Sequence, residues 1–338
     1  MARILIVAPN WIGDTLLAQP LFARLQRRLP GVVIDAIAPP WTAPLMERMP
    51  EVAEVIPVPF EHGRLQLRRR WRLGRQLRER RYDEAVVLPN SFKSALVPFF
   101  AEIPLRVGFV GESRYGLLNI LHKLDEKKVP LMAERYAQLA ERPGEAPHRP
   151  LAPPRLIVDQ ANQIITMSRL GLDRRRPVVV MCPGAEFGPA KRWPAKHFAE
   201  LARRLAARGR AVWTVGSKAD KPVGEEIAVL SDGAATNLCG RTDVASAVDL
   251  MALAELVVSN DTGLMHVAAA LKRPLIALYG SSSPEHTPPL SDHARIARLE
   301  GLPCSPCYQR VCPLGHFKCM NDLSPQQVLG EIELIEAE

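Results

Sequence analysis

The 338-residue sequence lacks any apolar run long enough to cross a bilayer. Its longest runs, at 94–101 and 264–271, fall far short of the ~20 residues that a membrane-spanning helix needs. The N-terminus also lacks the pattern of a secretory signal, because Met1-Ala2-Arg3 leads directly into an apolar segment. We therefore expect a cytoplasmic protein.

Two common nucleotide-binding motifs are absent as well. No Gly-Lys-Ser or Gly-Lys-Thr of a Walker loop occurs, and no Gly-x-Gly-x-x-Gly follows the first predicted strand. These absences argue against a P-loop kinase and against an NAD-dependent dehydrogenase. Cysteine is scarce, with six residues, and in a reducing compartment thiols or a metal site are expected before a disulfide framework.

Basic residues are in excess, with 44 Lys and Arg against 36 Asp and Glu and a net charge of +8. This balance favours an anionic partner such as nucleic acid, acidic lipid head groups or a phosphorylated small molecule. Residues 64–81 form a predicted helix with nine Arg and one Glu. An acidic membrane would relieve the repulsion, and nucleic acid would also fit, although Trp71 is the one aromatic residue among the nine arginines and base stacking uses several. An ordinary solvated helix face is the third interpretation.

Strands and helices alternate regularly, which predicts an α/β protein. Apolar strands at 3–8, 32–38 and 52–58 alternate with helices, of which the first is expected at about 15–29. This is the pattern of a doubly wound sheet, which binds ligands at the carboxyl ends of its strands. The Pro-rich segment 142–154 predicts a domain boundary, so the first domain spans 1–154. The second half of the sequence repeats this alternation of strands and helices, and its last predicted strand is at 274–279.

Residues 259–266, Ser-Asn-Asp-Thr-Gly-Leu-Met-His, predict a strand, a tight turn and a helix that Gly263 opens. The amide groups of the first helical turn and the positive end of the helix dipole can bind an anion. His266 lies one turn from Thr262 and can donate to a phosphate oxygen. A capped helix with a buried His is the alternative.

Three further positions suggest a nucleoside diphosphate site. The loop 183–193 offers glycines and Lys191 to a phosphate. Asp220 follows a later strand and could hold a ribose hydroxyl, as acidic residues do in dinucleotide folds. Asp14 lies in the loop after the first strand and could act as a general base. An Asp before a helix is equally an ordinary N-cap.

Several motifs then point to one family. Asn-Trp-Ile-Gly-Asp at 10–14, the loop up to Pro194 and Asn-Asp-Thr-Gly-Leu-Met-His-Val-Ala-Ala-Ala-Leu at 260–271 resemble the ADP-heptose:lipopolysaccharide heptosyltransferases of glycosyltransferase family 9. Leu-Pro-Asn-Ser-Phe-Lys-Ser at 88–94 and Arg-Tyr-Gly-Leu-Leu-Asn at 114–119 are most similar to the branch that adds the second heptose. The likeness covers nearly the whole chain in the right order.

The resemblance implies two Rossmann-like domains in the GT-B arrangement, with the active site in the interdomain cleft. The second domain would span 155–322, and a C-terminal helix at 323–338 would pack back toward the first. The implied reaction is inverting, metal-independent transfer of L-glycero-D-manno-heptose from ADP-heptose to the first heptose of the inner core, on heptosylated Kdo2-lipid A. It requires no cofactor and no nucleic acid, and it implies a peripheral enzyme at the cytoplasmic face of the inner membrane.

Three alternatives remain open. One is transfer to Kdo-lipid A, the reaction of the other branch of the family. The second is a basic nucleic-acid-binding protein with a four-cysteine zinc site. The third is an inactive protein that binds ADP-heptose without turning it over.

By matching motif, the resemblance implies roles for most of the candidate residues. Asp14 would be the general base, Asp261 would orient the heptose, and the first domain would take the acceptor. The diphosphate would lie on Lys191, Thr262, Gly263 and His266, and the anionic acceptor on Lys93 and Arg114. Asp220 lies outside the matching motifs and is assigned to the ribose from its place after a strand.

Four cysteines are left without a role in this reaction. Cys304, Cys307, Cys312 and Cys319 lie within one short segment, and the two-residue spacing of the first pair suits a structural zinc. The second pair is more widely spaced than in a usual zinc knuckle. Reduced thiols without a metal, or one disulfide formed on exposure to air, are the alternative.

Overall fold

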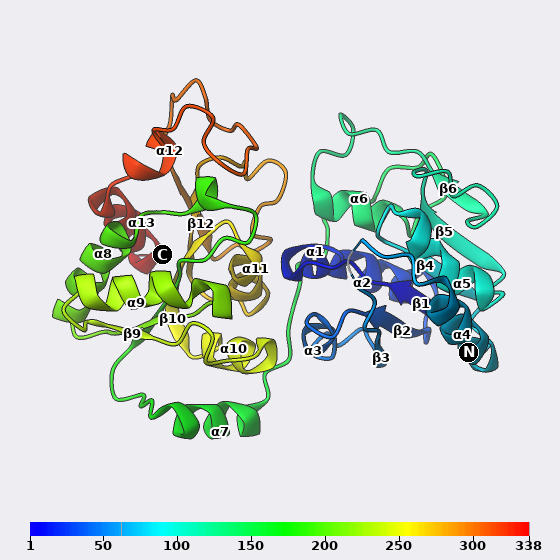
Figure 1. Ribbon diagram of the computed structural model, residues 1–338, viewed down its shortest axis with the longest axis horizontal. Helices are drawn as coiled ribbons and strands as arrows, with labels where there is room; N and C mark the ends of the chain where they lie inside the picture. Colours follow the sequence, from blue (N-terminus) through cyan, green and yellow to red (C-terminus); the bar gives the residue numbers. More distant parts are fainter. Residues whose placement is uncertain (62, 338) are drawn as a thin grey trace. The chain divides into compact units, whose positions relative to one another are not determined.

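The computed structural model describes residues 1–61 and 63–337. The chain divides into two compact units, Met1–Pro154 and Arg155–Glu338. Each unit contains a parallel sheet that is six-stranded in the described residues, with helices between the strands (Figure 1). The predicted fold class, α/β with two Rossmann-like sheets, is confirmed.

Unit 1 carries the sheet order β3-β2-β1-β4-β5-β6. Its elements are β1 (Arg3–Val7), α1 (Ile12–Leu17), α2 (Gln19–Arg28), β2 (Val33–Ala38), α3 (Ala43–Met46), β3 (Glu54–Pro57), α4 (Leu67–Leu77), η1 (Arg78–Arg80), β4 (Glu84–Val87), η2 (Phe92–Ala95), α5 (Leu96–Phe100), β5 (Leu105–Phe109), β6 (Ile120–His122) and α6 (Met132–Gln138), where η marks a short 3-10 helix.

Unit 2 carries the sheet order β12-β11-β10-β7-β8-β9. Its elements are α7 (Gln160–Leu170), β7 (Val178–Cys182), η3 (Pro189–Lys191), α8 (Ala195–Ala207), β8 (Ala211–Thr214), η4 (Lys218–Asp220), α9 (Lys221–Leu230), β9 (Ala235–Asn237), α10 (Val244–Met251), β10 (Ala254–Asn260), α11 (Gly263–Ala270), β11 (Leu275–Tyr279), β12 (Ala294–Arg298), α12 (Lys318–Asn321) and α13 (Pro325–Ala337).

Both sheets follow the Rossmann strand order, counted from the third strand of each unit through the first to the sixth. In this order the first three strands extend the sheet in one direction, and the last three extend it in the other direction from the first strand. We call the place between the first and fourth strands the reversal point. Ligands bind at the carboxyl ends of the strands on either side of it. The point lies between β1 and β4 in unit 1 and between β7 and β10 in unit 2. Three of the segments picked out in the sequence therefore flank these points: the loops at 10–14 and 183–193 and the turn at 260–263.

The central strands are apolar because helices cover both faces of a parallel sheet. Residues 4–7 of β1 and all of β7 are buried. At the C-terminus, α13 contributes Val328, Leu329 and Ile332 to the core of unit 2, where it packs on α8 and β12. This segment is thus an integral part of unit 2.

Two predicted helices differ from the observed ones. The single helix expected at 15–29 is α1 followed by α2, with the break at Ala18. Pro20 has no N–H to donate to the preceding turn, so one continuous helix would lose a hydrogen bond there. The basic helix is also shorter than expected, since α4 begins at Leu67 after Gln66, which is left-handed. None of the helices in the described residues is long and apolar enough to span a membrane.

Candidate active site

The turn between β10 and α11 is built as the sequence predicts. Thr262 is the N-cap residue of α11, with extended backbone angles of φ −147° and ψ 170°, and the helix begins at Gly263. The Thr262 side chain makes no capping hydrogen bond, so its hydroxyl is not used by the helix itself. The first amide groups of a helix also lack partners within that helix. The turn therefore directs donors toward the carboxyl end of the sheet.

Lys191 and Asp261, 70 positions apart, form an ion pair at this edge. The Lys191 Nζ atom lies 2.5 Å from Asp261 Oδ2, and the Ser282 hydroxyl donates to the same oxygen at 2.5 Å. The Asp261 carboxylate is almost fully buried, while 17% of the Lys191 side chain is exposed. Three loops, after β7, β10 and β11, thus meet at one carboxylate.

Asn260 fixes the loop at 183–193 to the end of β10. Its side-chain amide donates to the Pro183 carbonyl at 2.8 Å, and its side-chain oxygen accepts from the Trp193 N–H at 3.1 Å. Asn260 is completely buried. Sequence reasoning assigned it no role, because an Asn in a turn usually signals only the turn. Here it holds both ends of the loop that carries Lys191.

His266 is buried in the first turns of α11. Burial lowers its pKa to about 4, while the charge of Asp261 raises the pKa and that of Lys191 lowers it. The imidazole is therefore neutral at pH 7. In this state it can give one ring N–H to a phosphate oxygen, but it adds no positive charge.

The Asp220 carboxylate packs against Gly184 in the loop at 183–193. Its Oδ2 atom accepts from the backbone N–H of Ser217 at 2.9 Å and from the Ser217 hydroxyl at 2.7 Å. A Cβ atom at Gly184 would lie only 2.4 Å from the Asp220 carboxylate, so glycine is required at position 184. The carboxylate is thus held in place beside the Lys191 loop, and its role toward a ribose stays a prediction.

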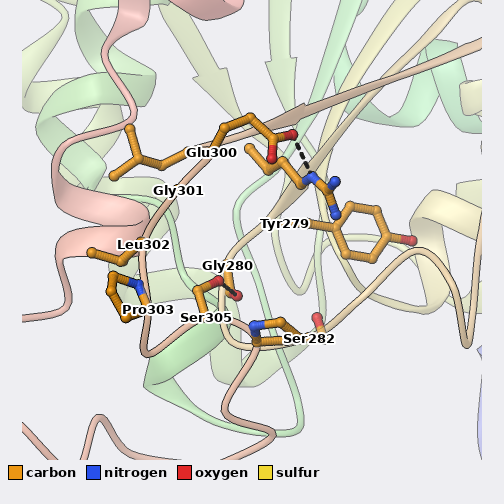
Figure 2. Close-up of a pocket in the computed structure, with 11 residues that line it drawn as sticks. Tyr279, Gly280, Ser282, Glu300, Gly301, Leu302, Pro303 and Ser305 are labelled. Carbon is orange, nitrogen blue, oxygen red and sulfur yellow. Dashed lines mark hydrogen bonds and ion pairs between the residues drawn. The ribbon is translucent and has the colours of Figure 1, made fainter.

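A pocket of about 390 Å³ opens beside Asp261, on the side of Ser282. It is lined by the end of β11 and by residues 298–303, 305 and 306, including Arg298, Glu300 and Ser305. Arg298 donates to Glu300 at 2.7 Å (Figure 2). The sequence did not reveal this pocket, because β12, which leads into it, was not predicted.

The four clustered cysteines are free thiols, each partly exposed. Among the described residues, no group of three or more His, Cys, Asp or Glu side chains is arranged to hold a metal ion. The thiols also differ in environment. Burial raises the pKa of Cys319 on α12 to about 11, whereas backbone hydrogen bonds lower the pKa of Cys312. The predicted structural zinc site is therefore not supported.

In unit 1, Asp14 lies in the first turn of α1. The N-cap residue of that helix is Trp11, so Asp14 is the third helical residue and the N-cap alternative is wrong. Burial raises the pKa of Tyr136 on α6, and the negative charge of Asp14 raises that pKa further. Asp14 thus lies at the carboxyl end of β1, at the reversal point of its own sheet.

A second pocket, of about 650 Å³, lies at the same edge of unit 1. Its lining includes Asn10, Trp41, Asn90 and Lys93. Lys93 thus lines a pocket at this edge, and its role toward an acceptor stays a prediction.

Arg114 is buried and contacts two residues that line this pocket, Pro89 and Asn90. The side chain is 1% exposed and donates to the Pro89 carbonyl at 2.7 Å, the Phe109 carbonyl at 2.5 Å and the Asn90 side-chain oxygen at 3.2 Å. Burial lowers its pKa. Its position suits a residue that shapes the pocket wall better than one that binds an acceptor directly.

Comparison with known proteins decides the family. Residues 70–318 match the model of glycosyltransferase family 9 (heptosyltransferase). The chain belongs to glycosyltransferase family 9. Among its relatives in this family are lipopolysaccharide heptosyltransferase 2 of Escherichia coli K12, 48% identical, and lipooligosaccharide heptosyltransferase 2 of Haemophilus influenzae Rd, 45% identical. In both cases the likeness covers 98% of each chain.

The fold of this family 9 glycosyltransferase agrees with a solved relative. The structure of E. coli ADP-heptose LPS heptosyltransferase II matches with a TM-score of 0.88 and 45% identity, over 99% of this chain and 98% of that one. The predicted enzyme class, a glycosyltransferase, is confirmed. Most of unit 2 lies within the matched range, including the Lys191–Asp261 pair and the α11 turn.

Proposed function

We propose that this protein transfers L-glycero-D-manno-heptose from ADP-heptose to the first heptose of the lipopolysaccharide inner core, with inversion and without a metal. Relatives that cover nearly the whole chain at 43–48% identity bear the name heptosyltransferase 2. Those named heptosyltransferase 1 are 25–27% identical, which makes transfer to Kdo-lipid A the weaker alternative. The structural observation that carries the proposal is the meeting of Lys191, Asp261 and Ser282 beside the α11 turn.

The donor site proposed here lies in unit 2. The diphosphate of ADP accepts from the first amide groups of α11, from the neutral His266 ring and from Lys191. Asp261 accepts from a hydroxyl of the heptose, and Asp220 from a ribose hydroxyl. The lysine and the helix N-terminus stabilise the negative charge that develops on the leaving diphosphate.

Asp14 is the proposed general base. It accepts the proton of the attacking hydroxyl of the acceptor heptose while the oxygen forms a bond to C1 of the donor heptose. The bond from C1 to the diphosphate oxygen breaks with its electron pair, and ADP leaves. Because attack occurs on the face opposite the leaving group, the configuration at C1 inverts.

We place the acceptor in the pocket of unit 1, where Lys93 provides a positive charge for acidic groups of the inner core. The enzyme would work at the cytoplasmic face of the inner membrane as a peripheral protein. Exposed Trp71 and Leu67 alternate with exposed Arg on α4, a pattern that suits an anionic bilayer surface. The four cysteines have no part in this reaction.

Mass spectrometry of the product tests the proposed function. Purified protein is incubated with ADP-heptose and either heptosylated or Kdo-terminated lipid A. We expect one heptose to be added only to the heptosylated acceptor. Addition to the Kdo-terminated acceptor alone would establish the other heptosyltransferase reaction, and no transfer to either would reject both.

A further inference from the structure

The cysteine loop, residues 304–317, carries three of the four clustered cysteines and is hydrogen-bonded to the turn after β11. The Ser305 hydroxyl donates to the Gly280 carbonyl at 2.6 Å, and the Tyr308 N–H donates to the Ser281 carbonyl at 2.7 Å. The next residue along the chain, Ser282, donates to Asp261. These contacts place residues 305–308 directly beside the proposed donor site.

The same loop is also tied to the segment that carries Lys191. The Ala190 N–H donates to the Arg310 carbonyl at 3.1 Å. A Cβ atom at Gly188 would lie 2.4 Å from that carbonyl oxygen, so the main chain at position 310 packs on a bare glycine. The backbone of Arg310 is therefore fixed next to the Lys191 loop.

The side chains of Arg310 and Lys191 both lie over the aromatic ring of Phe187. The guanidinium carbon lies 5.7 Å from the centre of the Phe187 ring, and the Lys191 Nζ atom lies 5.1 Å from it. The ring positions both cations without neutralising either one. The two charges thus lie within about 11 Å of each other, which is comparable to the Debye length of ~8–10 Å in physiological salt.

A count of charges shows why a second cation matters. Asp261 already neutralises Lys191, and His266 is uncharged at pH 7. These three side chains therefore present no net positive charge to a diphosphate. Arg310 differs, because no carboxylate in the described part of the chain forms an ion pair with it.

We propose that Arg310 is a donor-binding residue whose guanidinium binds the diphosphate of the nucleotide sugar together with Lys191. The role rests on the proposed function, in which the donor carries a diphosphate. Guanidinium groups bind phosphate oxygens through two parallel hydrogen bonds, and such charge-assisted contacts are stronger than neutral ones. The cysteine loop then serves to present this arginine.

ADP binding to the full chain tests the proposal. We expect Arg310→Gln to raise the Kd for ADP about tenfold, because one charge-assisted contact is lost. Titration calorimetry measures this Kd. The KM for ADP-heptose should rise by a similar factor, with kcat changed less than about twofold. Arg310→Lys, which keeps the charge but loses the two parallel hydrogen bonds, should lose less affinity than Arg310→Gln. Arg174→Gln, which removes an exposed arginine elsewhere in unit 2, is the matched control and should bind ADP as the wild type does.

Three outcomes would overturn the role of Arg310. They are an unchanged ADP Kd in Arg310→Gln, an equal loss in Arg174→Gln, or a loss in Arg310→Gln that Arg310→Lys does not restore, which would indicate a structural role. Failure of the proposed function has a separate signature, because the wild-type protein itself would then neither bind ADP nor use ADP-heptose.

Discussion

At the scale of single residues, the proposed roles assign the chemical step to Asp14 and donor binding to other residues. Its carboxylate belongs to unit 1, whereas Lys191 and the α11 turn belong to unit 2. We expect Asp14→Ala to lower kcat by about 10²-fold or more, the usual worth of a general base, and to leave the ADP Kd within twofold of the wild-type value. Transfer assays and calorimetry on the same preparation measure both quantities. Asp125→Ala, an exposed carboxylate of unit 1, is the control, and near-normal turnover in Asp14→Ala would reject the assignment.

His266, in the proposed donor site, makes the free energy of unfolding depend on pH. Its folded-state pKa of about 4 is below the unfolded value of ~6.5, so between these values the unfolded chain binds a proton that the folded chain does not. Stability is therefore lost as the pH falls from 6.5 toward 4. The loss amounts to about 2 kcal/mol between pH 7 and pH 5.

Urea unfolding at the two pH values measures this effect. We expect His266→Gln to reduce the difference between pH 7 and pH 5, and His293→Gln, which changes an exposed histidine, to keep it. An unchanged difference in His266→Gln would show that this histidine titrates normally in the folded protein.

At the scale of elements, α4 combines a structural and a surface role. Arg70 is buried, stacks on the Phe60 ring at 4.0 Å and donates to the Leu65 carbonyl at 2.7 Å, so it serves the fold. The other arginines of the helix, at 68, 69, 72 and 75, are exposed. At ~1 kcal/mol for each basic residue near an anionic membrane, several of them together would supply the peripheral membrane docking proposed above.

Vesicle sedimentation checks this surface without the transfer reaction. We expect the wild type to bind vesicles that contain phosphatidylglycerol, and the triple variant Arg68→Gln, Arg72→Gln and Arg75→Gln to bind at least about tenfold more weakly. The control removes three arginines of unit 2, at 174–176. Equal binding by both triple variants would mean that α4 is an ordinary solvated helix.

The elements that the sequence predicted best are those buried on both faces. Strands β1, β7 and β10 read as continuous apolar runs because helices cover the sheet on either side. The edge strands β9 and β12 were missed, since an edge strand is only partly buried and β12 alternates alanine and isoleucine with arginine. The motifs at 183–193 and 260–266 could be placed at strand ends for the same reason.

Contacts within the site were harder to predict. The Lys191–Asp261 pair joins residues 70 positions apart, and each had been matched to a ligand when the sequence was considered alone. The contacts of Asn260 and Arg310 likewise depend on loops folding onto one another. Local patterns carry no information on such contacts.

At the scale of the whole molecule, the two units repeat one strand order and divide the proposed work between them. Each unit offers its candidate residues at the reversal point of its own sheet: Asp14 and Lys93 in unit 1, and Lys191 with the α11 turn in unit 2. In the proposed reaction, residues from distant parts of the sequence would act together, each from the equivalent edge of its own sheet. It also explains why the alternation of strands and helices was enough to predict the fold class.

The Lys191–Asp261 ion pair has a consequence for the catalytic cycle. Because the lysine already has a partner at 2.5 Å, an incoming diphosphate must compete with a carboxylate that belongs to the protein. In the proposed cycle, Asp261 would recover the lysine when ADP departs, and this exchange would lower the cost of breaking the contact with the product. The carboxylate would then compete with the product for the lysine, which would favour rapid release of ADP and limit inhibition by accumulated ADP.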